Sequence, residues 1–339
     1  MTTQATRPVP VVPAFVWPLA LLAIAAALPA FASGFVVFQA TQVLIYALAI
    51  LGLNLLVGFS GQLSLGHGAF FAIGAYTAAI LMGQFDLAYG WALPAAGLVA
   101  FAFGFLFGLP ALRLEGVYLA MATFSLAVAT PQVLKLSVLT PWTGGSPGIG
   151  ATKPSAPLGL PLSDDQWLYC VTLVAGCLLY WVARSLVSSR SGLAMLAVKE
   201  NPLAAQAMGV NIALYKTLAF GMSAAFNGVA GALSAMAVQY ISPDSFTFYL
   251  SAYILVGLVV GGVGWLPGAL FGGLFVLLVP NVAEGISKGL SGAVYGVILI
   301  ALIFLLPAGA STFRDQFLNR FGRTSGRIKS PPQGARHEH

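Results

Sequence analysis

Residues 37–83 read VFQATQVLIYALAILGLNLLVGFSGQLSLGHGAFFAIGAYTAAILMG. Two apolar runs, 37–57 and 67–83, flank the glycine-rich segment 58–68. A helix of about twenty apolar residues spans the hydrocarbon core of a bilayer. The runs lack the alternation of polar and apolar residues that marks the strands of membrane barrels. This stretch therefore predicts two transmembrane helices joined by an irregular segment.

The composition extends this prediction to the whole chain. Of 339 residues, 59% are hydrophobic and only 7% are charged, whereas a soluble domain carries about 25% charged residues. In lipid, only helices and closed barrels satisfy their own backbone groups, so we expect an all-α membrane protein. The net charge of +6 reflects basic residues in loops and tail, and we expect no nucleic-acid partner.

Ten apolar runs qualify as candidate spans. They are 14–33, 37–57, 67–83, 90–110, 116–139, 167–187, 214–239, 246–263, 266–284 and 290–307. The expected division is a cytoplasmic N-terminus (1–13), a transmembrane domain (14–310) and a basic cytoplasmic tail (311–339). Ala30-Phe31-Ala32 resembles a signal-peptide cleavage site, but the preceding run is long for a signal peptide, so we expect an uncleaved first helix.

The basic residues predict the orientation. With ten spans and the N-terminus inside, only Lys135, Lys153 and Lys288 of the 15 Lys and Arg residues fall on the outside. Cytoplasmic loops carry such an excess of Lys and Arg. Both termini are therefore expected in the cytoplasm.

Two further patterns concern packing and the outer face. Glycines spaced four apart predict close helix contacts, at Gly104/Gly108, Gly257/Gly261, Gly264/Gly268, Gly268/Gly272 and Gly292/Gly296. The longest outer loop, Trp142–Pro161, places Lys153 opposite Asp164 and Asp165.

Segment 58–68 contains four glycines and several small polar side chains. Irregular backbone at membrane depth is tolerated where it is buried in protein or lines a cavity, but the segment also fits an ordinary cytoplasmic turn. Polar residues at or near membrane depth are candidates for a translocation pathway: Asn54, Gln62, Ser64, His67, Thr123, Ser125 and Asn227. Each of them also fits a purely structural role, bonding neighbouring helices, and His67 fits it better than proton transfer.

The sequence lacks several kinds of chemistry. It contains no G-x-x-x-x-G-K-[S/T] phosphate loop, and no arrangement of catalytic or metal-ligating residues. Ionisable side chains are nearly absent from the spans, whereas ion- and proton-driven carriers usually need them. We expect a non-enzymatic chain without a cofactor or metal, powered from elsewhere.

The inner loop 188–213 predicts a helix outside the bilayer. Asn201 is a good N-cap, Pro202 suits the first helical position, and Gly209 can end the helix in the left-handed conformation. Such a two-turn element can transmit force from a cytoplasmic partner, or it can simply be a structural re-entry helix.

This loop resembles the coupling loop of ABC importer permeases, since Glu200 precedes the run AAQAMG at 204–209. Other stretches resemble the branched-chain amino acid ABC transporter permease family (LivH/LivM type): GLNLLVG at 52–58, GQLSLGHGAFF at 61–71, LRLEGVYLA at 112–120, TGGSPGI at 143–149, GGVG at 261–264 and LPGA at 266–269. The family often carries an acidic residue in place of Val117 and more acidic character around Pro202-Leu203, which leaves room for another substrate.

The resemblance implies the ABC importer permease fold in a bacterial cytoplasmic (inner) membrane, with branched-chain or other hydrophobic amino acids as cargo. It also implies a second, LivH-like permease, two ATPases that hold ATP and Mg, and a substrate-binding protein outside. The coupling residues would be Gly192, Lys199, Glu200, Pro202, Ala204, Ala205, Met208 and Gly209. The alanines would seat in a groove of the ATPase, with Lys199 and Glu200 at the rim.

Three alternatives remain at this point. A urea, amide or aromatic-acid permease would share the fold. A secondary transporter would need intramembrane charge, and a passive channel would not require the coupling helix.

Overall fold

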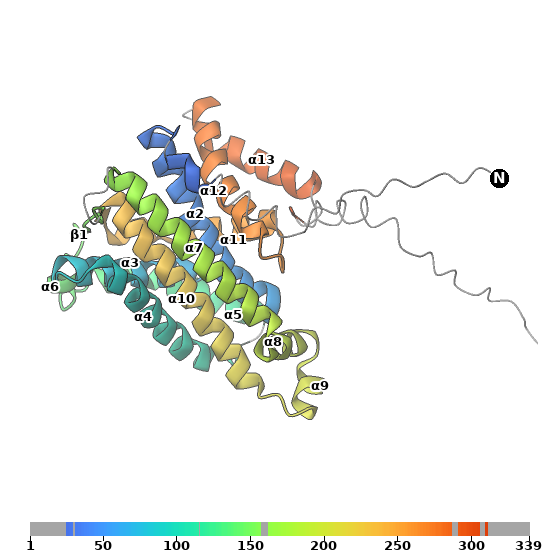
Figure 1. Ribbon diagram of the computed structural model, residues 1–339. Coiled ribbons are helices and arrows are strands. Elements are labelled where there is room, and N and C mark those ends of the chain that lie inside the picture. The colour runs from blue at the N-terminus through green and yellow to red at the C-terminus, as the bar shows by residue number, and fades with distance from the viewer. Residues whose placement is uncertain are drawn as a thin grey trace, which may run out of the picture.

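The computed structural model describes residues 25–29, 31–114, 116–156, 162–286, 291–305 and 309–310. Within these ranges the chain is a bundle of helices with one short strand pair (Figure 1). The longer helices are α2 (Gly34–Asn54), α3 (His67–Gly83), α4 (Tyr89–Ala111), α5 (Val117–Leu134), α7 (Asp164–Ser188), α10 (Ile212–Val238), α11 (Phe248–Gly261), α12 (Gly268–Ile286) and α13 (Ser291–Leu305). The shorter elements are the π-helix η1 (Leu55–Phe59), α6 (Thr140–Thr143), α8 (Arg190–Glu200), α9 (Pro202–Ala207), the 3-10 helix η3 (Pro243–Phe246), and the antiparallel strands β1 (Ile149–Gly150) and β2 (Tyr240–Ile241).

Seven helical segments of the described residues are long and apolar enough to cross a membrane. They are Gly34–Phe59, Tyr89–Ala111, Val117–Leu134, Asp164–Ser188, Ile212–Val238, Pro243–Gly261 and Gly268–Gly285, and two apolar helices, His67–Gly83 and Gly292–Leu302, are shorter. The chain is therefore an all-α, multi-pass membrane protein. Nine of the ten candidate spans coincide with a described helix; most of the first span, 14–33, and both predicted tails lie outside the described residues.

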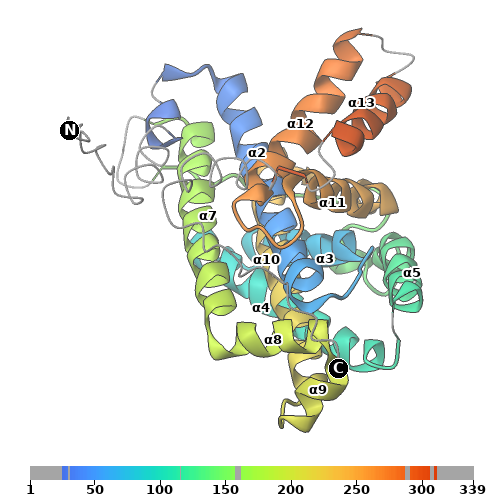
Figure 2. The ribbon, with the colours of Figure 1, turned by 90° about the vertical axis from the view of Figure 1, so that its right-hand side faces the viewer.

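Helix α10 runs through the bundle and packs against α2, α3 and α4 (Figure 2). Its contact with α3 is a backbone contact, because a Cβ added to Gly74 would lie 2.0 Å from the carbonyl oxygen of Gly228. No side chain fits at that distance, so glycine determines how closely these two helices approach.

Helices α11 and α12 meet through the predicted glycines. A Cβ on Gly261 would lie 2.3 Å from the carbonyl oxygen of Gly268, which confirms close packing there. A Cβ on Gly292 or Gly296 would meet no described atom within 4 Å, so the glycine pair in α13 makes no comparable contact with the described part of the chain.

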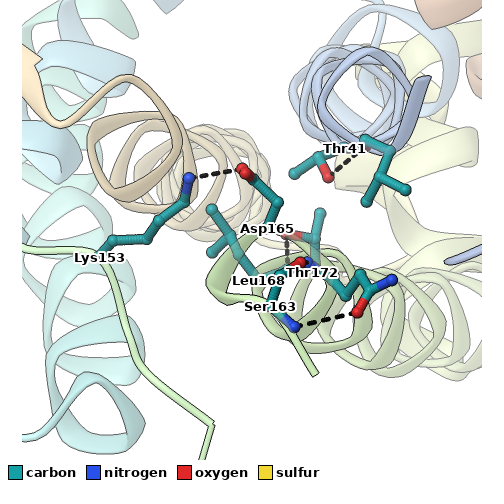
Figure 3. Close-up of polar contacts among 8 residues, drawn as sticks. Thr41, Lys153, Ser163, Asp165, Leu168 and Thr172 are labelled. Carbon is teal, nitrogen blue, oxygen red and sulfur yellow. Dashed lines mark hydrogen bonds and ion pairs between the residues drawn. The ribbon is translucent and has the colours of Figure 1, made fainter. Parts of the chain in front are cut away.

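The start of α7 is fixed by a capping box and an ion pair (Figure 3). Ser163 Oγ accepts a hydrogen bond from the Gln166 amide at 3.4 Å, and Gln166 Oε1 accepts one from the Ser163 amide at 3.0 Å. Lys153 lies 2.5 Å from Asp165. The expected pairing of the outer loop with the acidic start of this helix is confirmed at Asp165.

The loop 188–213 holds two helices that lie across one end of the bundle (Figures 1 and 2). The predicted short helix is confirmed as α9: the Asn201 side chain accepts from the Ala204 amide at 3.0 Å, and Gly209 has a φ of 84°. Helix α8 was not predicted as a separate element. Ser189 caps it by accepting from the Gly192 amide at 3.4 Å.

Candidate functional site

The candidate site begins where α2 loses its regular geometry. The helix widens into the π-helix η1, and the chain stays non-helical from Gly61 to Gly66 before α3 begins at His67. Single π-helical turns are frequent at functional sites. Gly61 has a φ of 71°, a conformation that glycine adopts at little cost. The glycine-rich segment therefore breaks one helix and starts the next.

Asn54 bonds this break to the α11–α12 loop. Its Nδ2 donates to the Trp265 carbonyl at 3.0 Å, and its Oδ1 accepts from the Gly264 amide at 2.8 Å. Gly58 fits between these groups, since a Cβ there would lie 2.3 Å from Asn54 Oδ1. Asn54, one of the predicted polar residues, thus connects the glycine-rich segment 58–68 to the α11–α12 loop, which lies more than 200 residues away in the sequence.

A chain of buried hydrogen bonds continues from the break into α10. Ser64 Oγ lies 3.0 Å from His67 Nδ1, and His67 Nε2 lies 2.6 Å from Ser223 Oγ. Ser223 Oγ donates to the Gly52 carbonyl at 2.6 Å, and the Gly66 amide donates to Ser64 Oγ at 3.3 Å.

These partners determine the tautomer of His67. Because Ser223 uses its hydrogen on a carbonyl, its oxygen must accept from His67 Nε2–H, and Nδ1 must then accept from Ser64. His67 is 1% exposed. The network accommodates a neutral imidazole that holds α2, α3 and α10 together.

Two further predicted residues extend these contacts, Thr123 to the glycine-rich segment and Asn227 to α2. Thr123 of α5 accepts from the Leu65 amide at 2.9 Å. Asn227 of α10 donates to the carbonyls of Ala49 and Ser223, at 3.3 and 3.0 Å. Its Oδ1 is buried without a hydrogen-bond partner among the described residues.

Six of the seven pathway candidates are therefore buried and hydrogen-bonded, at segment 58–68 or in the helices next to it, whereas Ser125 is exposed on α5 and bonds back to Met121. Sequence reasoning missed Ser223, and also Ser251, which accepts from the Gly68 amide at 2.9 Å. Ser223 precedes Asn227 by four residues, which places both on one helix face; that spacing could have revealed it. Whether these residues line a pathway stays a prediction.

Helix α9 presents apolar side chains at the end of the bundle. Leu203 and Met208 are 79% and 86% exposed, and Pro202 and Ala204 are also exposed. Ala205 is buried and turns toward the chain. Gly192 is buried at the corner between α7 and α8, where a Cβ would lie 2.3 Å from the Val187 carbonyl oxygen. The residues predicted to act in coupling thus divide into exposed residues, such as Leu203 and Met208, and buried residues, such as Ala205 and Gly192.

Lys199 and Glu200 end α8, and both are exposed as residues. The Lys199 ammonium nevertheless reaches inward and donates to the Gly58 carbonyl at 2.8 Å. Gln62 Nε2 donates to Ser60 Oγ at 2.7 Å and to the Lys216 carbonyl at 3.1 Å. Segment 58–68 is therefore bonded to Lys199 at the end of α8 and to Lys216 near the start of α10.

Comparison with known proteins places these features in a family. The sequence model of the family described as "Branched-chain amino acid transport system / permease component" matches residues 35–303. The chain belongs to this family. Its description names a permease that is one component of a transport system, so members of this branched-chain permease family work with other components.

Two relatives within the family carry the name LivM. The chain is 38% identical over 271 residues to the "High-affinity branched-chain amino acid transport system permease protein LivM" of Salmonella typhimurium and to that of Escherichia coli. The match covers 73% of this chain and 63% of each relative. The "Autoinducer 2 import system permease protein LsrC" of E. coli is 28% identical over 197 residues, covering 56% of this chain and 54% of LsrC. No solved structure matches the chain significantly.

Proposed function

We propose that this chain is the membrane-spanning permease subunit of an ABC importer that carries branched-chain or other hydrophobic amino acids across the cytoplasmic (inner) membrane of a bacterium. The observation that carries the proposal is α9, a capped helix with apolar side chains exposed at the end of a transmembrane bundle, in a sequence of the branched-chain permease family. An apolar face in water favours a partner that covers it.

The proposed topology has ten spans with both termini in the cytoplasm. Twelve of the 15 Lys and Arg residues then lie on the inside, as positive residues do in cytoplasmic loops. This orientation also puts α8, α9 and the turn after η1 on the cytoplasmic side. The ATPases would have to dock on that side, because ATP is a cytoplasmic substrate.

In the proposed coupling, an ATPase groove receives α9. Leu203, Ala204 and Met208 would enter the groove, and the flexible Met208 side chain can adapt to an irregular apolar pocket. Glu200 would form a rim contact. Ala205 and Gly192 would act from within the chain, by holding α9 and α8 in place.

The remaining partners are proposed from the same reasoning. A second, LivH-like permease would pair with this chain, two ATPases would supply ATP hydrolysis, and a binding protein would deliver substrate from outside. Substrate would pass between the permeases, along a lining to which Asn54, Gln62, Ser64, His67, Thr123, Ser125 and Asn227 would contribute. This chain itself would catalyse no reaction.

The substrate that the importer carries is a separate question from its assembly. Similarity to LsrC, whose name describes autoinducer 2 import, favours a family in which related permeases carry different substrates. The binding protein that accompanies this chain would then determine which substrate is carried.

Affinity purification of the tagged chain from its native membrane tests the assembly. We expect two ATPases and a second permease to be recovered, and leucine uptake into liposomes to require ATP. In that complex, Ala204→Arg places a charge on the exposed face of α9 and should lower substrate-stimulated ATP hydrolysis at least about tenfold. Ser188→Arg, an exposed change at the end of α7, is the matched control. A chain that is recovered alone and transports leucine without ATP would instead be a secondary transporter or a channel.

A further inference from the structure

One short turn, residues 58–62, bonds to the chain on both sides of α9, at the end of α8 and near the start of α10. Before α9, the Lys199 ammonium donates to the Gly58 carbonyl at 2.8 Å. After α9, the Lys216 carbonyl accepts from Gln62 Nε2 at 3.1 Å. The two contacts join residues 141 and 154 positions apart in the sequence.

The Lys199 contact satisfies a group that the helix itself leaves open. The last carbonyls of a helix have no intrahelical partner, and cations stabilise that end. Gly58 lies in the last turn of η1. Lys199 Cγ would lie 2.8 Å from a Cβ on Gly61, so its aliphatic stem packs along the turn as well.

The turn is in contact with the buried core on its other side. Gly58 packs against Asn54 and Gly264, and the chain leads within a few residues to Ser64 and His67, which bond to Ser223. A displacement of the turn therefore changes either these hydrogen bonds or the packing of the α11–α12 loop.

The turn also has room to move. It borders a pocket of about 190 Å³, whose other lining includes Leu114, Leu119 and Pro202. Close-packed interiors resist displacement, whereas the side of the turn that faces the pocket borders open space. The turn thus combines fixed contacts to α8 and α10 with free space on one side.

We propose that Lys199 is a positioning residue that links the coupling loop to the turn 58–62, so that movement of α9 reaches the Ser64–His67–Ser223 chain through the Lys199–Gly58 hydrogen bond, while the Gln62–Lys216 hydrogen bond ties the turn to α10. The inference rests on the proposed function, because an ATPase must move α9. It differs from a role of Lys199 at the rim of the ATPase groove, since the ammonium acts inside its own chain.

The test uses the complete complex in liposomes. Lys199→Met keeps the aliphatic stem and removes the donor, and Lys199→Arg keeps a donor. Arg190→Met removes the same charge from the exposed start of the same helix. The readouts are the recovery of ATPase subunits, leucine transported per ATP hydrolysed, and amide hydrogen exchange of residues 58–66 with and without bound ATPase.

For Lys199→Met we expect normal recovery of the ATPases and about three- to tenfold less leucine per ATP, the effect of losing one hydrogen bond of ordinary net strength. Lys199→Arg should restore most of this ratio, and Arg190→Met should leave it unchanged. In the unmodified complex, ATPase binding should alter exchange in 58–66, and Lys199→Met should abolish that response.

Three results would overturn the inference. An unchanged ratio in Lys199→Met would show that the link carries no movement. If the Lys199→Met complex lost its ATPase subunits, Lys199 would be a docking residue. If amide exchange in 58–66 were the same with and without bound ATPase in the unmodified complex, the turn would not take part in the movement. An unmodified complex that transports no leucine would instead contradict the proposed function itself.

Discussion

Replacement of Ser223 by alanine is the most direct test of the buried chain of hydrogen bonds. The Ser223 hydroxyl makes two contacts of 2.6 Å, accepting from His67 Nε2 and donating to the Gly52 carbonyl. Ser223→Ala leaves both groups without this partner in a site where His67 is 1% exposed. An unsatisfied buried polar group costs about 1–3 kcal/mol, whereas interhelical hydrogen bonds in membranes average about 0.6 kcal/mol.

Two hydrogen bonds at the membrane average give about 1.2 kcal/mol, and one fully unsatisfied buried group gives up to about 3 kcal/mol. The expected loss of unfolding free energy is therefore about 1–3 kcal/mol. The measurement is unfolding in mixed micelles of mild detergent and SDS, followed by tryptophan fluorescence. Thr217→Val is the matched control. Its hydroxyl, also on α10 and buried, bonds only to carbonyls of its own helix, at 2.8 and 3.0 Å.

A double-mutant cycle separates the network from simple packing. Ser223→Ala and His67→Phe should be non-additive by about 1 kcal/mol or more, since they remove the same contact. If Ser223→Ala destabilises no more than Thr217→Val does, or if the two changes simply add, the buried chain does not hold α3 to α10 as argued.

Two further changes test local packing and capping. Gly74→Ala should destabilise the fold by more than about 3 kcal/mol or prevent folding, because its Cβ would lie 2.0 Å from the Gly228 carbonyl oxygen. The control in the same unfolding assay is Gly176→Ala, where an added Cβ would meet no described atom within 4 Å. Equal effects of the two changes would refute the close contact. Asn201→Ala removes the cap on the Ala204 amide and should speed amide exchange in α9 about fivefold, as expected for a cap worth about 1 kcal/mol. An unchanged exchange rate would show that tertiary contacts alone hold this helix.

Much of the fold follows from local sequence. Apolar runs such as 67–83 and 90–110 correspond to α3 and α4 almost residue for residue, because lipid requires each span to be a continuous helix. The exception is the run 116–139, where α5 ends at Leu134. Hydropathy alone does not reveal that end, because Leu136, Val138 and Leu139 keep residues 135–139 largely apolar although Lys135 and Ser137 lie among them.

The sequence by itself also determined the short helix α9, because an N-cap at Asn201, a proline at the first position and a left-handed glycine at 209 act within a few residues of one another. It identified polar residues such as His67 as unusual for their surroundings, but it could not supply their partners. Ser223 lies 156 residues from His67, and Gly58 lies 141 residues from Lys199. Those contacts exist only because the glycine-mediated packing of α3, α10 and their neighbours brings the segments together, and no periodicity along one helix encodes the position of another. The tertiary structure alone therefore decided that the glycine-rich segment joins the coupling loop to the core.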